Sequence, residues 1–335
     1  MILSSSQMKS PRQGVEKQAP QILVGGQAVW EGVMMRSPQG TAMAVRQPAG
    51  NVLVQKLTFP SLANVAPVFR WPILRGIAAL WDSLVLGIKV LNLSLVLGSK
   101  PEEKLSKGQA AFSLALALGL VVLLFFVAPF FLSRLLSVWL SPRLLAVVEG
   151  VLRLAIFFGY LWLISLIPEV KRVLYQYHGA EHKVVHTFEH GEPLTVENAR
   201  RFSTLHPRCS TSFLLVVLIV SFVLFVFLDF PNSWARFASR ILFLPLIAGF
   251  SYELIRLFTL YPRSIFTRVV IAPGLATQKL TTAEPSSAQL EVAIAALKAS
   301  LGLPSSEENG PTPKEENDPT PKEENHPLSM EAIER

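Results

Sequence analysis

The sequence predicts a predominantly α-helical integral membrane protein, a bundle of about four transmembrane helices with two polar units attached to it. Half of the 335 residues are hydrophobic and only 16% are charged, which is too little charge for an ordinary soluble protein. Runs without charge that are long enough to cross a bilayer alternate with polar connections. The two polar units are a small N-terminal β-rich segment and a histidine-rich helical loop between two spans.

The β-rich unit is expected at residues 21–60, on the membrane surface. Its run at 41–57 alternates loosely between apolar and polar residues and is interrupted around Gly50, which is typical of a hairpin. Gly25 and Gly26 could allow the backbone to approach a ligand closely. A tight turn is the commoner reason for two adjacent glycines, and it is the expectation here.

The membrane bundle is expected at 61–261 and begins with an apolar helix at 73–97. Arg75, Asp82 and Lys89 recur every seven residues and therefore share one face of this helix. Such a charged stripe favours an amphipathic helix in the interface, or one packed against the bundle, over a span exposed to lipid. Counting this helix as a fifth span would also place the basic N-terminal segment outside the cell.

Four further runs have the length and composition of transmembrane helices. They lie at about 110–132, 144–167, 211–228 and 241–261. The second run contains Glu149 and Arg153 one helical turn apart, where the two side chains can pair. The fourth contains Glu253, for which Arg256 is the simplest partner.

The connections differ in their content of Lys and Arg, which predicts the orientation of the bundle. The turns at 133–143 and 231–240 hold two each, whereas the loop at 168–210 holds six. Both termini and the histidine loop are therefore expected in the cytoplasm. The net charge of +7 is spread along the chain beside apolar segments, which indicates contact with anionic membrane lipids and no binding of nucleic acid.

The chain is expected to begin with a flexible leader and to end with a helical segment and a disordered tail. Residues 1–20 are polar and lack the apolar core of a secretory signal, so they predict a flexible leader. Residues 262–302 are expected as a cytoplasmic segment with an amphipathic helix that Gly302 ends. Residues 303–335 repeat PTPKEEN and are rich in proline and glutamate, which predicts a disordered tail.

Five of the six histidines gather in the loop at 168–210. Four of them recur every fourth residue: His178, His182, His186 and His190. A four-residue step on a helix advances about 40° past a full turn, so these side chains form one slowly drifting stripe. Together with Glu181 the first two read H-x-x-E-H, the reversed zincin arrangement of two metal-binding histidines and a glutamate that polarises water. The competing interpretation of the histidine stripe is the solvent-exposed face of a helix that lies on a membrane surface.

The spacing limits which histidines could share one ion. His178 and His186 are about 12 Å apart along a straight helix, so an ion can use His182 with either of them but not all three. A third ligand must come from elsewhere, or the stripe carries two metals. His206, in the same polar loop, is the leading candidate for an extra ligand. Cys209 could bind zinc as a thiolate, but a buried thiol is the favoured interpretation of a lone cysteine.

Five sequence blocks stand out along the chain: GGQAVWEGVMMR at 25–36, YHGAEHKVVH at 177–186, LTVENARRFSTLHPRCSTSF at 194–213, SYELIRL at 251–257 and LTTAEPSSAQLEVAIAAL at 280–297. Together, and in this order, they resemble the YqhQ-like family of bacterial membrane proteins. The family is described as predicted metal-dependent enzymes. By resemblance, its motif supports a site made of His178, Glu181, His182 and His186, and adds His206 and Cys209 by position. The resemblance also implies the inner (cytoplasmic) membrane of a bacterium.

These patterns predict a membrane-embedded enzyme that depends on a divalent metal, with zinc as the expected ion and a hydrolase as the leading hypothesis. Glu181 would accept a proton from water that attacks an acyl or phosphoryl centre. The substrate would be a membrane peptide, a lipid or a lipid-linked molecule that reaches the cytoplasmic face of the membrane. The alternative is a non-catalytic membrane scaffold or assembly factor whose loop binds metal or docks partners.

Overall fold

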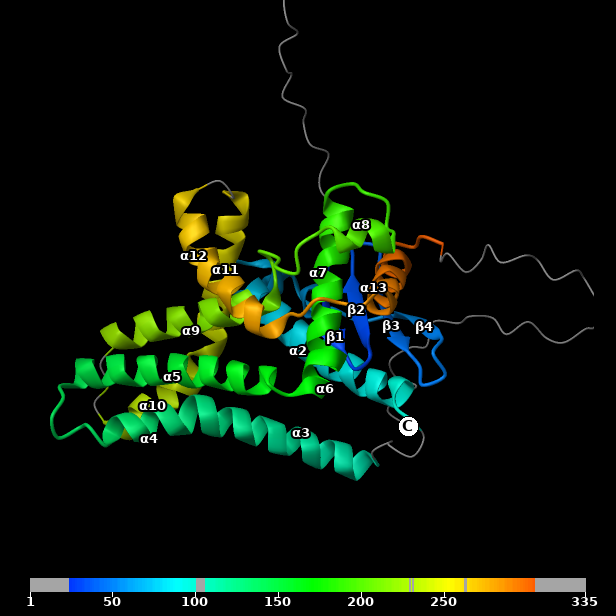
Figure 1. Cartoon of the computed structure of the whole chain (residues 1–335). Helices are drawn as coiled ribbons and strands as arrows, with labels where there is room; N and C mark the ends of the chain where they lie inside the picture. Colours follow the sequence, from blue (N-terminus) through cyan, green and yellow to red (C-terminus); the bar gives the residue numbers. More distant parts are fainter. Residues whose placement is uncertain (1–23, 101–105, 229, 231, 262–263, 305–335) are drawn as a thin grey trace, which may run out of the picture.

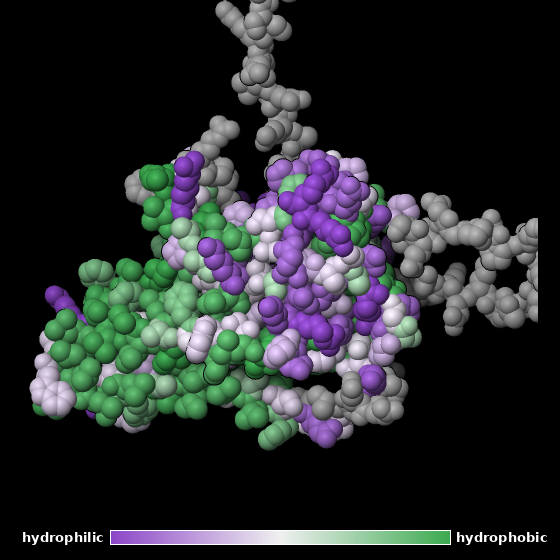
Figure 2. Space-filling view, viewed as in Figure 1, coloured by the Kyte–Doolittle hydropathy of each residue, from purple (hydrophilic) through white to green (hydrophobic). Residues whose placement is uncertain are grey.

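The computed structural model describes residues 24–100, 106–228, 230, 232–261 and 264–304. The predicted leader at 1–20 and all but the first residues of the predicted tail lie outside this part of the chain. A polar unit, made of a sheet with helices α7, α8 and α13, lies at one end of a long helical body (Figure 1). In Figure 2 hydrophilic residues gather over α7 and α8, and hydrophobic residues cover α3, α5 and α9.

The described chain consists mainly of helices. The longer ones are α2 (Leu74–Gly98), α3 (Lys107–Val122), α4 (Ala128–Arg134), α5 (Pro142–Ser165), α7 (Gln176–Glu189), α9 (Ser210–Phe227), α10 (Ser233–Leu242), α11 (Leu244–Leu260), α12 (Ile265–Thr281) and α13 (Ser287–Ser300). Short helical turns are α1 (Leu62–Val65), η1 (Pro67–Arg70), η3 (Leu123–Val127), α6 (Pro168–Val170), η4 (Lys171–Tyr175) and α8 (Val196–Arg200).

The N-terminal β-rich unit is confirmed as a four-stranded antiparallel sheet in the order β1-β2-β3-β4. Its strands are β1 (Gly25–Val29), β2 (Gly32–Arg36), β3 (Thr41–Arg46) and β4 (Val52–Leu57). The expected hairpin joins β3 to β4, and Gly50 in its turn has φ 93°, which glycine adopts without steric cost. Gly25 and Gly26 lie inside β1, so the tight turn expected there is wrong.

The two faces of the sheet pack on different helices, because side chains alternate along each strand. Val33 and Met35 of β2 belong to a buried core shared with α7 and α13. Met34, between them, belongs to a second core in which Leu86 and Val90 of α2 are buried. The sheet is therefore held between the helix that carries the histidines and the first long apolar helix.

Four helical segments of the described chain are long and apolar enough to cross a membrane: Leu74–Gly98, Ala111–Arg134, Pro142–Ser165 and Ser210–Phe227. The last three overlap the runs expected at 110–132, 144–167 and 211–228. The fourth expected run, at 241–261, belongs to a broken segment in which α10 and α11 meet at a bend of 48° and together pass the same test.

The helix α2 differs from the other long apolar helices because it joins the polar unit to the helical body. At its C-terminal end, Gly98 packs against Val45 and Trp30 of the sheet region. Near its N-terminal end, Gly76 packs against Gly249 of α11. Asp82, from the charged stripe, is buried and accepts hydrogen bonds from the Ser61 hydroxyl and from the N–H of Leu62 at 2.9 Å.

Buried charges inside the helical body are paired. Glu149 accepts a hydrogen bond from Arg153 at 2.8 Å, as expected, and two more from Arg240 of α10 at 2.8 and 2.9 Å. Arg240 also lies over the Phe225 ring, 3.8 Å from its centroid. Glu253 forms an ion pair with Arg75 of α2, a partner that is distant in the sequence.

Candidate metal centre

The histidine stripe lies on α7, as the four-residue spacing indicates. Tyr177, Ala180 and Val184 on one side of this helix are buried in the core shared with the sheet. The histidines occupy the neighbouring side, where the loop between α8 and α9 runs past them. The π-helical turn η4 precedes α7 directly, and π-helical turns often occur near functional sites.

The structure divides the possible ligands on this side of α7 into two groups, each with donor atoms within 4.8 Å of one another. The first group is His178, His182 and Cys209, and the second group is His186, Glu189 and His206. The ring centroids of His178 and His182 are 4.4 Å apart. The histidine spacing allowed His182 to share an ion with either His178 or His186. In the structure, His182 lies in one group with His178. Cys209, rather than His206, lies with that pair.

Backbone carbonyl groups fix both imidazoles of the first group. The Nδ1 atom of His178 lies 2.9 Å from the carbonyl oxygen of Thr281, and Nδ1 of His182 bonds the carbonyl oxygen of Thr204. A carbonyl oxygen can only accept, so each Nδ1 is the donor. Burial lowers the pKa of His182, which favours its neutral form with a lone pair on Nε2. Histidines that bind metals usually donate their other ring N–H in this way.

The Nε2 atom of His182 is buried and makes no hydrogen bond of normal geometry in the described chain, although the Cys209 thiol lies close enough to oppose the lowering of the His182 pKa. The Cys209 thiol lies 3.2 Å from Nε2 of His178, and its single proton can satisfy only one of the two imidazoles. A buried polar atom without a partner costs about 1–3 kcal/mol. Two imidazole nitrogens and one sulfur are also a donor set that zinc prefers. The first group therefore fits a metal ion.

Gly179 allows this arrangement. A Cβ atom at this position would lie 2.1 Å from the carbonyl oxygen of Ala283, so a larger residue would push away the segment after α12. The N–H of Ala283 donates to the carbonyl of Tyr175 at 2.9 Å. This close approach places the Thr281 carbonyl beside His178. A glycine inside an otherwise helical run was the only signal for this contact in the sequence.

Glu181 lies between the first group and the sheet. The backbone N–H of Gly26, on the edge strand β1, lies near the Glu181 carboxylate and acts to lower its pKa. No other strand of the described chain covers the outer side of β1. Burial raises the pKa of Glu181, and the nearby His178 and His206 partly oppose that effect. The sequence motif indicated the glutamate but not the backbone group that lies near it.

The second group is occupied by hydrogen bonds within the protein. In His206, Nδ1 accepts from the N–H of Arg208 and Nε2 lies 3.3 Å from Glu189. Glu189 also forms an ion pair with Arg208. In His186, Nε2 lies 2.9 Å from the carbonyl oxygen of Leu205, and burial lowers the pKa of this histidine to about 4. These contacts leave the second group less free to bind an ion than the first. His190 is exposed at the end of the helix.

Gln278 of α12, which the sequence analysis did not single out, anchors the loop that carries His206 and Cys209. Its amide accepts from the N–H of His206 and donates to the carbonyl of the same residue, both at 2.8 Å. The amide also donates to the Ser212 hydroxyl at 2.9 Å. Because Gln278 is fully buried, these bonds fix the start of α9 and hence the position of Cys209.

Comparison with known proteins gives a family but no described activity. A family model described as "Protein of unknown function (DUF1385)" matches residues 71–303, a range that contains both histidine groups. The uncharacterized protein YqhQ of Bacillus subtilis (strain 168) is 34% identical over 304 residues, which cover 86% of this chain and 95% of that protein. No solved structure matches the chain.

Proposed function

We propose that this chain, which belongs to the DUF1385 family, is an integral membrane enzyme that depends on a divalent metal ion, with zinc as the expected ion. The main support is the buried Nε2 atom of His182, which has no hydrogen-bond partner in the described chain and faces the Cys209 thiol. The reaction class that fits best is hydrolysis at an acyl or phosphoryl centre.

His178, His182 and Cys209 would hold the ion through two Nε2 atoms and one sulfur. Three protein ligands leave one position open, which distinguishes catalytic from structural zinc sites. A zinc ion held there acts as a Lewis acid and lowers the pKa of water. His186 and His206, expected as ligands from the sequence, support the loop in this proposal instead.

Glu181 is the group proposed to take a proton from the attacking water at its carboxylate. The backbone N–H of Gly26 lies near that carboxylate and favours its charged form, which is the form that can accept a proton. The raised pKa of Glu181 brings its proton affinity closer to that of a general base working near neutral pH. The Thr204 and Thr281 carbonyls keep both imidazole rings oriented.

We place the site at the cytoplasmic face of a bacterial inner membrane, with both termini in the cytoplasm. The polar unit lies at one end of the helical body, and α4 and α10 lie at the other (Figure 1). This arrangement supports the orientation expected from the Lys and Arg counts. Trp139 and Trp234, which flank the far end and are exposed, are typical of the opposite membrane interface. In this orientation α2 lies at the interface, where the sheet covers one of its faces.

Elemental analysis of the full-length protein, purified in detergent without chelators, tests the proposal. We expect about one zinc ion per chain in the wild type and its loss in His182→Ala. His190→Ala is the matched control, because His190 belongs to the same stripe but is exposed at the helix end. Folding of each variant is checked by circular dichroism. A folded wild type without metal would overturn the proposal and favour the non-catalytic scaffold.

A further inference from the structure

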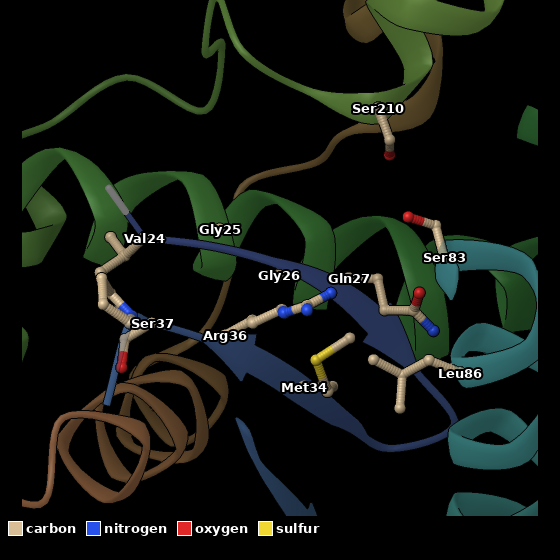
Figure 3. Close-up of a pocket in the computed structure, with 11 residues that line it drawn as sticks. Val24, Gly25, Gly26, Gln27, Met34, Arg36, Ser37, Ser83, Leu86 and Ser210 are labelled. Carbon is tan, nitrogen blue, oxygen red and sulfur yellow. The ribbon is translucent and has the colours of Figure 1, made fainter. Parts of the chain in front are cut away.

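A cavity of about 470 Å³ lies between the sheet, α2 and the start of α9 (Figure 3). Its lining comes from the start of β1, the end of β2, the middle of α2 and the first residue of α9. A volume of this size is within the usual range for small-molecule sites. None of the histidines of α7 lines the cavity.

The strand register explains which side chains reach the cavity. Gly25 pairs with Arg36, and Gln27 pairs with Met34. Paired residues in an antiparallel sheet point to the same face, and Met34 belongs to the core shared with α2. Arg36 and Gln27 therefore point to the α2 side of the sheet, as Figure 3 shows. A Cβ atom at Gly25 would meet nothing within 4 Å, because the space in front of it is open.

The chemistry of the lining suits an anion. Arg36 is the single charged residue among the described residues of the lining, and none of the described residues forms a hydrogen bond or ion pair with its side chain. The hydroxyl groups of Ser83 and Ser210 point into the same space (Figure 3), and Gln27 adds an amide. An arginine fork with several further donors matches the oxygens of a phosphate better than the two oxygens of a carboxylate.

Two direct connections join the cavity to the proposed centre. Ser210, in the lining, follows Cys209 of the first histidine group. Gly26, also in the lining, has its backbone N–H close enough to Glu181 to lower the pKa of that carboxyl group. The cavity and the proposed centre therefore share the backbone at Cys209–Ser210 and the strand β1, which packs against α7.

The walls of the cavity also suit an amphiphile. Ser83 and Leu86 come from α2 and Ser210 comes from α9, two of the helices that are long and apolar enough to cross a membrane. One helical turn after Ser210, and so on the same side of α9, the side chain of Leu214 is 49% exposed. Such an apolar surface beside a cationic cavity can hold acyl chains while the cavity holds the head group.

We propose that this cavity binds the phosphate head group of an anionic membrane lipid and presents it to the centre described above. The inference rests on the proposed function, and it assigns the substrate class as a phosphate-bearing lipid. Arg36 is the principal binding residue, Ser83, Ser210 and Gln27 complete the head-group site, and the exposed surface of α9 around Leu214 contacts the lipid chains.

Binding of fluorescent phosphatidic acid to the full-length protein in phosphatidylcholine nanodiscs tests the inference. We expect Arg36→Gln to weaken binding by about tenfold or more, the effect of losing a charge-assisted hydrogen bond. Gly25→Val, whose Cβ would enter open space in front of the strand, should weaken binding to a similar degree. Arg36→Lys should keep part of the affinity, because it keeps the charge but not the fork. Arg143→Gln is the matched control, an exposed arginine at the far end of α5, and should bind as the wild type does.

Equal affinity in the wild type and Arg36→Gln would overturn the inference. Competition by glycerol phosphate or inorganic phosphate as strong as that by unlabelled phosphatidic acid would overturn the assignment to a lipid. The titrations are repeated with a chelator and in His182→Ala, where Arg36-dependent binding should persist. A wild type that lacks metal but binds the lipid through Arg36 would therefore contradict only the proposed function. If the protein contains zinc but binds the lipid with the same affinity in the wild type and in Arg36→Gln, only the cavity assignment is contradicted.

Discussion

The two histidine groups on α7 use the same residue type on the same side of one helix, yet they differ in what remains unbonded. In the first group, Nε2 of His182 is buried without a hydrogen-bond partner in the described chain. In the second group, both ring nitrogens of His206 have partners. One carboxylate oxygen of Glu189 is also buried without a hydrogen bond in the described chain, but an ion pair with Arg208 compensates its charge. Histidine spacing alone therefore does not distinguish a ligand from a structural residue. The partners that the surrounding backbone and side chains supply make the difference.

The largest expected effect comes from removing a donor of the first group. Cys209→Ser should lower the affinity for zinc by about a hundredfold or more, since binding energies of about 10–16 kcal/mol are shared by a few ligands. His206→Gln, in the second group, should change the affinity less than about threefold. Competition with a zinc-binding dye measures both. Equal losses in the two variants would show that the two groups form one site.

A smaller effect is expected from Gly179→Ala, which tests whether the backbone around the first group is needed. The added Cβ would lie 2.1 Å from the Ala283 carbonyl oxygen, and such overpacking costs about 1–3 kcal/mol. Thermal unfolding should show this loss, together with weaker zinc binding. Gly159→Ala is the control, because a Cβ at this exposed helix position meets nothing within 4 Å. Unchanged stability and zinc affinity in Gly179→Ala would mean that the segment at 281–283 shifts to accommodate the added methyl group and that its position is not needed for the first group.

The smallest expected effect concerns the pH dependence of the second group. Burial lowers the pKa of His186 in the folded protein from its ordinary value of 6.5 to about 4. The unfolded chain therefore binds the proton more readily, and stability is lost as the pH falls from about 6.5 towards about 4. After allowance for partial exposure, about 1 kcal/mol should disappear between pH 7 and pH 5.

Urea unfolding at the two pH values measures this loss in the wild type and in His186→Gln. Glutamine can still donate to the Leu205 carbonyl but does not titrate, so the variant should lose less stability on acidification. His190→Gln serves as the comparison, because His190 is exposed at the helix end. An identical pH dependence in the wild type and His186→Gln would contradict the structural role of the second group.

The sequence by itself determined those features that depend on local periodicity. Uncharged runs of sufficient length gave the helices at 111–134 and 210–227, and the break at Gly50 gave the hairpin of the sheet. The four-residue recurrence of histidines placed the stripe on one side of α7. Each of these patterns is complete within a short segment, because helix and strand periods repeat every few residues.

Only the tertiary structure decided which of those residues act together. The partners of the first group come from other segments: the carbonyl of Thr204, the carbonyl of Thr281 and the thiol of Cys209. The backbone N–H of Gly26 in β1, about 150 residues earlier in the chain, lies near Glu181 and acts to lower its pKa. Neither periodicity nor composition predicts such contacts, because the contacts depend on how the sheet, α7 and the segment after α12 pack together. The close approach at Gly179 brings these parts into contact, and this packing leaves one buried imidazole nitrogen of His182 without a partner in the described chain.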